Sequence, residues 1–142
     1  MNAREVETNF KNAKKPRQRT ISAMKNEATS LHSQLVRSRG VCENCGNAWR
    51  TTGSKLECAH IVSRRFAATR TDETNAFCLC TRCHMHFTEW PLEFRDFVVA
   101  KVGQAHYDAL KAKAQAGAPR PVRAFWESEV ARLRALTKEK AA

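Results

Sequence analysis

Apolar residues recur at helical spacing in the first third of the chain. Within residues 21–39 they fall three or four positions apart, at Met24, Ala28, Leu31, Leu35 and Val36. This spacing places them on one face of a helix, and Gly40 is a typical residue after a helix end. The pattern predicts an amphipathic helix over residues 21–39.

The middle of the chain has a shorter, strand-like pattern. We predict a strand over residues 56–62, with His60 near its end, and the return strand of a hairpin over residues 75–79. Residues 63–74 form a basic loop between the two strands. A further helix is expected to start at the C-x2-C pair that follows and to run to about Glu89.

Three more helices are predicted towards the C-terminus. The first contains Pro91 in its opening turn, where proline is well tolerated, and ends at Gly103; the second covers residues 105–116. The third covers residues 122–136. Large side chains at helical spacing in the first and third helices are expected in the core: Trp90, Phe94, Phe97, Phe125, Trp126, Val130 and Leu133.

Composition divides the chain into three parts. Residues 1–20 are polar and basic with few large apolar groups, so we expect a disordered tail. Residues 21–116 are expected to form the main domain. The G-A-P-R-P stretch is the clearest linker, and residues 117–142 therefore comprise this linker and a C-terminal helix.

The sequence contains no signal that would take the chain out of the cytoplasm. No apolar run is long enough to span a bilayer, and the N-terminus lacks the apolar region of a secretory signal. We therefore expect a cytoplasmic protein with no membrane partner. In a reducing compartment, closely paired cysteines are more typical of metal ligands than of disulfides.

The net charge of +11 is concentrated at the two ends of the chain. Residues 1–40 carry nine Lys or Arg and three Asp or Glu, and residues 91–142 carry ten and six. The cysteine-rich centre, residues 41–90, carries six and five. Basic flanks around a nearly neutral centre are what a nucleic-acid enzyme with a cation site would show, although a solvated basic tail would give the same count.

Four of the six cysteines form two C-x2-C pairs, Cys42/Cys45 and Cys80/Cys83, with 34 residues between the pairs. Such pairs can converge on one tetrahedral Zn²⁺. We predict one structural zinc held by these four residues. Cys58 and Cys78 have no partner at this spacing and are expected to be small core residues, and His32 and His106 are expected to be ordinary surface or boundary residues of helices.

The centre of the chain also contains the spacing H-x14-N-x8-H, formed by His60, Asn75 and His84. Two of these residues lie between the two cysteine pairs and His84 directly follows the second pair. This arrangement resembles that of the HNH nucleases, a branch of the ββα-metal fold. The stretches L-E-C-A-H-I-V-S-R-R, T-R-T-D-E-T-N and L-C-T-R-C-H are most similar to phage recombination endonucleases of the NinG (Rap) type and related small phage HNH proteins. The resemblance covers about residues 31–95.

The resemblance implies a fold and a set of catalytic roles. It implies a mainly helical α+β protein with a zinc-stabilised ββα-metal core and flanking helices. His60 would be the general base, Asn75 would fix the orientation of that histidine, and His84 would bind a catalytic divalent ion such as Mg²⁺, distinct from the structural zinc. Basic residues of the loop and the tail are expected to contact DNA phosphates: Arg64, Arg65, Arg70, Lys14, Lys15, Arg17 and Arg19.

One position departs from the pattern of the family. Many HNH enzymes carry a second metal ligand directly before the general base, and here that residue is Ala59. Glu57 is the nearest carboxylate and the substitute candidate, although strand alternation would place residues 57 and 60 on opposite faces. His86, Asp72 or water are the other candidates for this place.

Two functions from different classes fit these observations. The first is a metal-dependent DNA endonuclease that hydrolyses phosphodiester bonds with a histidine base, on recombining or branched DNA in a bacterial host cell if the chain is phage-encoded. The second is a zinc-stabilised DNA-binding protein without catalysis, such as a regulator or packaging accessory, which Ala59 would suit. The joint presence of His60, Asn75 and His84 favours the nuclease, because zinc binding requires none of them.

Overall fold

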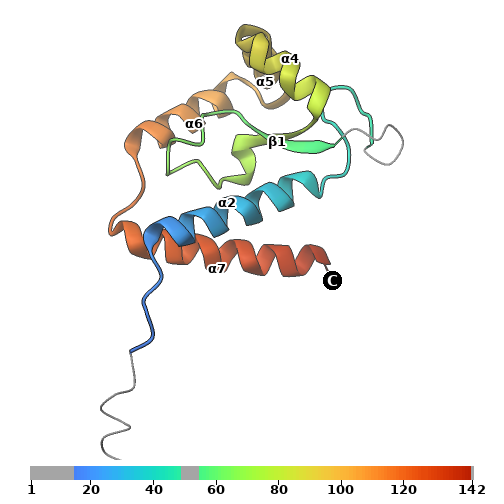
Figure 1. The fold of residues 1–142 in the computed structure, drawn as a ribbon. Coiled ribbons are helices and arrows are strands. Elements are labelled where there is room, and N and C mark those ends of the chain that lie inside the picture. Colours follow the sequence, from blue (N-terminus) through green and yellow to red (C-terminus); the bar gives the residue numbers. More distant parts are fainter. Residues whose placement is uncertain (1–14, 49–54, 142) are drawn as a thin grey trace, which may run out of the picture.

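The computed structural model describes residues 15–48 and 55–141, and Figure 1 shows how they are arranged. Over these ranges the chain forms five α-helices and one two-stranded antiparallel sheet. The prediction of a mainly helical α+β fold is confirmed. Lys14 and most of the predicted tail lie outside the described residues. Within the described ranges, no helix has both the length and the apolar character needed to cross a membrane.

Helix α2 spans Ile21–Arg37. Thr20 caps its N-terminus, because the threonine hydroxyl accepts a hydrogen bond of 3.0 Å from the backbone of the first turn. The helix ends two residues before the predicted limit, since Ser38 N–H closes the last turn and the chain then turns away through Gly40, whose φ is +82°. The predicted apolar stripe is buried at Met24, Ala28, Leu35 and Val36.

Strands β1 (Leu56–His60) and β2 (Ala76–Cys80) pair as an antiparallel hairpin. β1 ends two residues earlier than predicted. β2 begins one residue later than predicted and ends one later, because Asn75 belongs to a short 3-10 helix, η1 (Glu73–Asn75). The hairpin is therefore present as predicted, with its asparagine at the turn into β2 rather than within the strand.

The two faces of the hairpin contact different helices, because side chains alternate along a strand. Helix α4 (Thr81–Glu89) begins directly after β2 and covers one face, while α2 covers the other. The face towards α4 carries Glu57, Ala59, Phe77 and Leu79. The face towards α2 carries Cys58, His60, Ala76 and Cys78.

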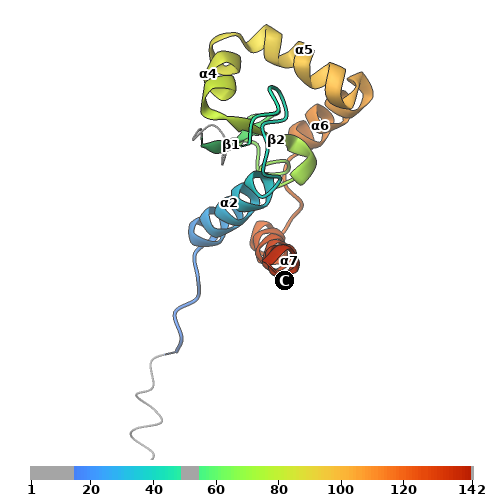
Figure 2. The same cartoon turned by 90° about the vertical axis from the view of Figure 1, so that its right-hand side faces the viewer.

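Helices α5 (Pro91–Val102) and α6 (Gln104–Ala116) continue on the α4 side of the hairpin, as Figure 2 shows. Aromatic rings of α5, β2 and α4 fill the core on this side: Phe97 lies 4.9 Å from Phe77 and 5.0 Å from Phe87, measured between ring centroids. The prediction that Phe97 belongs to the core is confirmed, and Phe94 also packs against it.

The prediction that Trp90 is a core residue is wrong. Its side chain is 56% exposed. Trp90 is the single residue that ends α4 and precedes α5, with a backbone that is not helical. The helical spacing that relates it to Phe94 therefore does not extend back through Trp90, and the tryptophan lies outside the apolar face of α5.

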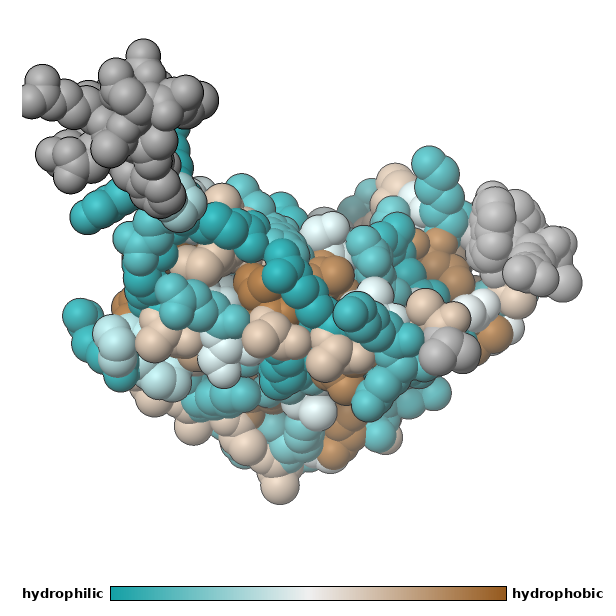
Figure 3. Space-filling view, turned by 90° about the horizontal axis from the view of Figure 1, so that it is seen from below, coloured by the Kyte–Doolittle hydropathy of each residue, from teal (hydrophilic) through white to brown (hydrophobic). Residues whose placement is uncertain are grey.

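Helix α7 (Val122–Ala141) lies beside α2 and runs in the same direction (Figure 1). The predicted burial of Trp126, Val130 and Leu133 is confirmed, and these residues pack with Met24, Ala28 and Leu35 in a second core cluster. The helix is five residues longer than predicted because four of the five extra residues, at 138–141, are Lys, Glu, Lys and Ala, which are strong helix formers. Figure 3 shows the α2–α7 side, where hydrophilic residues predominate and apolar residues appear in patches.

Arg132 connects α7 to the loop that precedes β2. Its guanidinium donates hydrogen bonds to the carboxylates of Glu73 and Glu129 and, at 3.0 Å, to Thr71 O. The ion pairs raise the pKa of Arg132 beyond its ordinary value. Helix α7 thereby supports the segment that carries Asn75, although α7 lies on the far side of α2 from the hairpin (Figure 2).

Candidate metal centre and active site

The first cysteine pair lies in a tight turn after α2. Cys42 N–H donates to Asn47 O at 2.9 Å, and Gly46 N–H donates to Cys42 O at 2.8 Å. Gly46 has a φ of +75°, a conformation that favours glycine. Glu43 fastens the turn to β2, because its N–H donates to Cys78 O at 2.8 Å and its carboxylate accepts from Cys78 N–H at 2.6 Å.

The second pair lies at the start of α4, with Cys80 at the N-cap and Cys83 in the first turn. The sulfur atoms of the four paired cysteines all lie within 4.8 Å of one another, and Cys45 Sγ is 3.9 Å from Cys80 Sγ. Sulfurs about 2.3 Å from one zinc would be about 3.8 Å apart. All six cysteines are free. The tetrad of Cys42, Cys45, Cys80 and Cys83 can therefore hold a metal ion such as zinc, as predicted.

The thiols of the tetrad differ in acidity. Burial raises the pKa of Cys42, but backbone N–H groups of Cys45, Cys80 and Asn44 donate to its sulfur and bring the pKa down to about 7. Burial and the neighbouring thiols raise the pKa of Cys83 to about 12, although Asn44 Nδ2 donates to its sulfur at 3.3 Å. The Cys42 thiolate is therefore favoured, whereas deprotonation of Cys83 beside the other sulfur atoms is unfavourable. A cation at the centre of the tetrad would stabilise the thiolates and make that deprotonation favourable.

His60 is the last residue of β1 and lies on the face towards α2. Its Nε2 lies 2.9 Å from Arg70 O. A carbonyl oxygen can only accept, so Nε2 carries the proton and the lone pair of the neutral ring is on Nδ1. Burial lowers the pKa of His60, and the charges of His32 and Arg64 lower it further. The ring is therefore a neutral, oriented imidazole near pH 7.

Asn75 is fully buried and holds the loop that follows β1. Its Oδ1 accepts from Val62 N–H at 2.8 Å, and its Nδ2 donates to Val62 O at 3.0 Å and to Thr69 O at 2.9 Å. The loop between these points ends beside Arg70, whose carbonyl orients His60. Asn75 therefore positions His60 through the backbone and does not touch the imidazole itself in any described contact.

We expect Asn75→Ala to lower the free energy of unfolding by about 3 kcal/mol, because the substitution leaves one buried and two partly buried backbone groups without a partner. Chemical denaturation of the purified protein measures this change. Asn26→Ala, at an exposed position of α2, is the matched control and should have little effect. Equal stability of Asn75→Ala and wild type would show that the loop does not depend on this side chain.

His84 and Glu57 meet on the opposite face of the hairpin. His84 Nδ1 lies 3.0 Å from Glu57 Oε1, and both side chains are about a third exposed. Side chains alternate along β1 as expected, so Glu57 and His60 point to different faces of the hairpin. Glu57 therefore lies on the same side as His84. Ala59 is buried in the core on that side and offers no ligand atom.

The other two candidates for the second ligand are engaged elsewhere. His86 Nε2 lies 2.6 Å from a carboxylate oxygen of Glu93 in α5. The carboxylate of Asp72 accepts from Lys113 Nζ in α6, also at 2.6 Å. Neither makes a described contact with His84. Of the protein groups considered from the sequence, only Glu57 lies beside His84.

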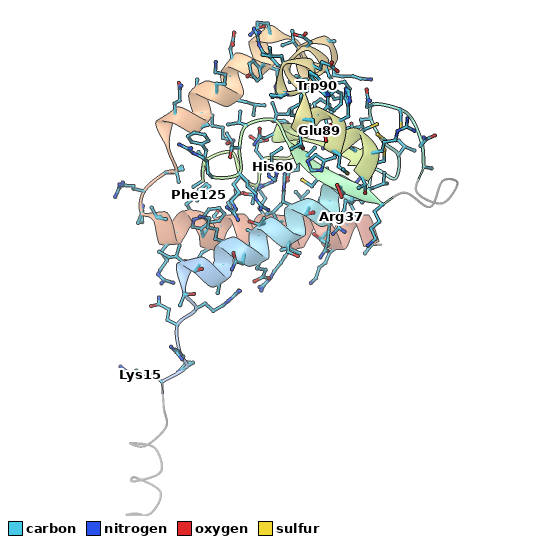
Figure 4. All side chains as sticks on the ribbon, turned by 45° about the horizontal axis from the view of Figure 1, so that its top comes forward. Lys15, Arg37, His60, Glu89, Trp90 and Phe125 are labelled. Atoms are coloured by element: carbon cyan, nitrogen blue, oxygen red, sulfur yellow. The ribbon has the colours of Figure 1, made fainter. Side chains whose placement is uncertain are left out.

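A groove of about 350 Å³ follows β1 where the strand passes α2. Figure 4 labels His60 and Arg37 in this region. Glu57 and His60 both line the groove although they belong to different faces, because β1 pairs only with β2 in the described sheet and its other edge is open. The remaining lining residues are Thr29, Ser33, Arg37, Lys55, Leu56, Cys58 and Arg64. The edge of β1 is therefore the place where groups from both faces can reach one substrate.

No described contact joins His60 to His84, because the two side chains start from opposite faces of the hairpin. His60 and His84 therefore do not share a face of the hairpin, and no described contact supports the expectation that both serve one phosphate; of the Glu57–His84 pair, only Glu57 lines the groove with His60.

The basic residues singled out from the sequence have different surroundings. Arg64 and Arg65 are exposed. Arg70 is used inside the protein, since its Nε donates to Thr29 Oγ1 at 2.7 Å and its Nη1 donates to Arg64 O at 3.0 Å. These two bonds fasten the loop to α2, so the Arg70 side chain has a structural task besides any contact with a phosphate.

The described part of the tail is extended and exposed. Lys15 and Arg17 precede α2, and Figure 4 shows Lys15 away from the helices. Arg19 is held by Glu27 of α2, with 2.6 Å between its Nη2 and the carboxylate. Arg134 of α7 binds the same carboxylate at 2.6 Å, so the charge of Arg19 is partly neutralised within the protein.

The prediction that His32 is a surface or boundary residue is wrong, because it is fully buried. Its Nε2 donates to Asp72 O at 3.0 Å, and its ring centroid lies 5.3 Å from that of His60. The signal was present in the sequence, since His32 follows Ala28 by four positions and precedes Leu35 by three, on the apolar stripe of α2. Because histidine is polar, this position was not counted as part of the apolar stripe.

Comparison of the chain with protein-family models, with curated proteins and with solved structures found no match in any of the three.

Proposed function

We propose that this protein is a metal-dependent DNA endonuclease of the HNH type. The observation that carries the proposal is the edge of β1, where a neutral imidazole and a carboxylate line one groove. His60 supplies the imidazole and Glu57 the carboxylate, and His84 Nδ1 lies 3.0 Å from Glu57 Oε1 although His84 does not line the groove itself. The hairpin and α4 that carry these groups are fastened together at the cysteine tetrad.

The chemistry of His60 suits a general base. Hydrolysis of a phosphodiester requires removal of a proton from the attacking water, and a neutral imidazole accepts a proton well near pH 7. The Arg70 carbonyl holds Nε2–H, so the free lone pair of His60 is in one defined place. Asn75 maintains this arrangement through the loop it holds. The attacking water would therefore be deprotonated by Nδ1 of His60.

The pair of Glu57 and His84 suits a divalent ion such as Mg²⁺. Mg²⁺ is bound by few protein ligands and keeps several waters, with substrate phosphate completing its shell, so a carboxylate and an imidazole are a sufficient protein contribution even though Ala59 offers nothing. When bound, such an ion stabilises the charge that develops on the phosphate and the leaving oxygen. The tetrad, with four soft ligands, suits a structural zinc instead.

The groove has the charge expected of a phosphate site. Arg37, Lys55 and Arg64 line it together with His60, and exposed Arg65 lies on the adjoining loop. Contacts of this kind position DNA without reading its sequence. The substrate class to test first is branched or recombining DNA, because the resemblance to phage recombination endonucleases suggests it. If the chain is phage-encoded, as that resemblance suggests, the protein would act in the cytoplasm of a bacterial host cell.

A plasmid-nicking assay tests the proposal. Wild-type protein loaded with zinc is expected to nick or linearise supercoiled plasmid when Mg²⁺ or Mn²⁺ is added, and to be inactive in a chelator. DNA binding without cleavage under every metal would favour the second function, a zinc-stabilised DNA-binding protein. The buried methyl group of Ala59, in place of a metal ligand, is the observation that supports this alternative.

We expect Glu57→Gln to raise the Mg²⁺ concentration needed for half-maximal cleavage by about tenfold or more, because an amide is a much weaker ligand than a carboxylate. A metal titration of the nicking rate measures the change. Glu93→Gln is the matched control, since Glu93 forms a similar exposed pair with His86, and it should behave as wild type. An unchanged metal requirement for Glu57→Gln would remove Glu57 from the site.

A further inference from the structure

A second group of potential metal ligands lies on the face of the hairpin opposite to the Glu57–His84 pair. It consists of His32 of α2 with Cys58 and His60 of β1, and we call it the His2Cys cluster. One ligand atom from each of the three residues lies within 4.8 Å of the other two. His32 Nδ1 is 3.8 Å from Cys58 Sγ, and the two imidazole centroids are 5.3 Å apart.

Both imidazoles of the cluster are oriented in the same way. His32 Nε2 lies 3.0 Å from Asp72 O, and His60 Nε2 lies 2.9 Å from Arg70 O. Since each carbonyl must accept, both Nε2 atoms carry the proton and both lone pairs are on Nδ1. A metal-bound histidine commonly donates its other N–H to a backbone carbonyl, which fixes the tautomer and the ring. Both histidines of the cluster meet this condition.

The cluster is buried on the side of α2 and reaches solvent on the side of the groove. His32 is fully buried, whereas Cys58 and His60 are partly exposed and line the groove along β1. Two imidazole nitrogens and one thiolate are a ligand set for a borderline-soft cation, while carboxylates and carbonyls are the set for Mg²⁺. Three protein ligands with one open position are typical of a zinc site that also holds a water.

We propose that the His2Cys cluster binds a second zinc ion, or a similar borderline-soft divalent cation, through Nδ1 of His32, Nδ1 of His60 and Sγ of Cys58. The ion replaces the thiol proton of Cys58, which is released to solvent, and a water from the groove completes a tetrahedral shell. This site is separate from the cysteine tetrad and uses none of its residues. It does not depend on the protein being a nuclease.

Occupancy of the cluster would have one consequence that rests on the proposed function. The lone pair of His60 that would deprotonate water is the one that would bind the ion. Zinc beyond the first equivalent would therefore suppress cleavage, and the suppression would be weaker without Cys58. Binding and cleavage are measured separately, so failure of the nuclease proposal leaves the binding result intact.

Equilibrium dialysis against Zn²⁺, with elemental analysis of the metal bound per chain, tests the site. Wild type is expected to bind two equivalents, and Cys58→Ala is expected to keep the first and to bind the second at least about tenfold more weakly. Cys78→Ala is the matched control, because Cys78 is also an unpaired cysteine on the α2 face of β2, and it should bind two equivalents.

Retention of the first equivalent shows that the Cys58 variant has folded around its tetrad. Cys58→Ser, which keeps the size of the side chain but lacks a thiolate, serves as the second variant and should lose the second equivalent in the same way. Saturation of wild type at one equivalent would overturn the proposal. Binding of a second equivalent by Cys58→Ala and Cys58→Ser with wild-type affinity would overturn it equally.

Discussion

His60→Ala is expected to lower the rate of plasmid cleavage by a factor of about 10² to 10⁴, the usual contribution of a positioned general base. The physical reason is the loss of the only neutral imidazole that lines the groove along β1 among the described residues. The measurement is the initial rate of nicking of supercoiled plasmid in Mg²⁺. Circular dichroism and zinc content, unchanged from wild type, would show that the variant is folded.

His106→Ala is the matched control for this prediction. His106 also donates its Nε2–H to a backbone carbonyl, at 3.1 Å from Thr74 O, but it does not line the groove. The variant should cleave at the wild-type rate. If His60→Ala also cleaves at the wild-type rate, the assignment of the base is wrong.

The pH dependence of cleavage gives a second readout for His60. A base acts in its deprotonated form, and burial lowers the pKa of His60 below the ordinary histidine value of 6.5. The pH at which wild-type activity falls to half of its plateau should therefore lie below 6.5. The residual activity of His60→Ala should lack that decline.

Removal of the metal from the cysteine tetrad is expected to unfold the hairpin and α4. Structural zinc contributes about 10–16 kcal/mol in small metal-binding domains, which is comparable to or larger than the roughly 5–15 kcal/mol by which whole domains are stable. Of the first cysteine pair, Cys42 packs in the core but Cys45 is exposed and has no such packing among the described residues to hold it in place. Thermal melting followed by circular dichroism, with and without a strong chelator, measures the effect.

Cys83→Ser should reproduce the effect of the chelator, because it removes one of the four ligands, and amide hydrogen exchange should show the loss of protection in β1, β2 and α4. The α2–α7 pair has its own core of Trp126, Leu133 and their neighbours, so its protection should fall less. Cys78→Ala, outside the tetrad, is the control and should retain metal. A chelated protein with an unchanged melting temperature would contradict a structural role for the metal.

The helices could be predicted from the sequence because each carries its own local signals. The apolar stripe of α2, Pro91 at the start of α5 and Gly103 after it are all visible without any tertiary information. The predictions were wrong at helix ends, where these local signals are absent. Trp90 joins two helices and belongs to the apolar face of neither, and the last turns of α7 form without an apolar stripe because their residues favour helix intrinsically.

The cysteine tetrad could be predicted because the spacing of the four cysteines in the sequence indicates a metal site. The residues that surround each histidine could not be predicted from the sequence. Strand alternation correctly separates Glu57 from His60, but only the docking of α4 shows that His84 joins Glu57. Likewise, the contact of His32 with Cys58 and His60 depends on how α2 crosses the hairpin. Which helix covers which face is a tertiary property that no short motif contains.

A crystal structure of the zinc-loaded protein with DNA and Ca²⁺, which binds oxygen ligands with a less strict geometry than Mg²⁺, is the most direct test of the proposed nuclease site. We expect a backbone phosphate at the open edge of β1, with the ion bound by Glu57 and His84 and a water between that phosphate and Nδ1 of His60. DNA bound on another surface, with no phosphate within reach of His60 or of the Glu57–His84 pair, would contradict it.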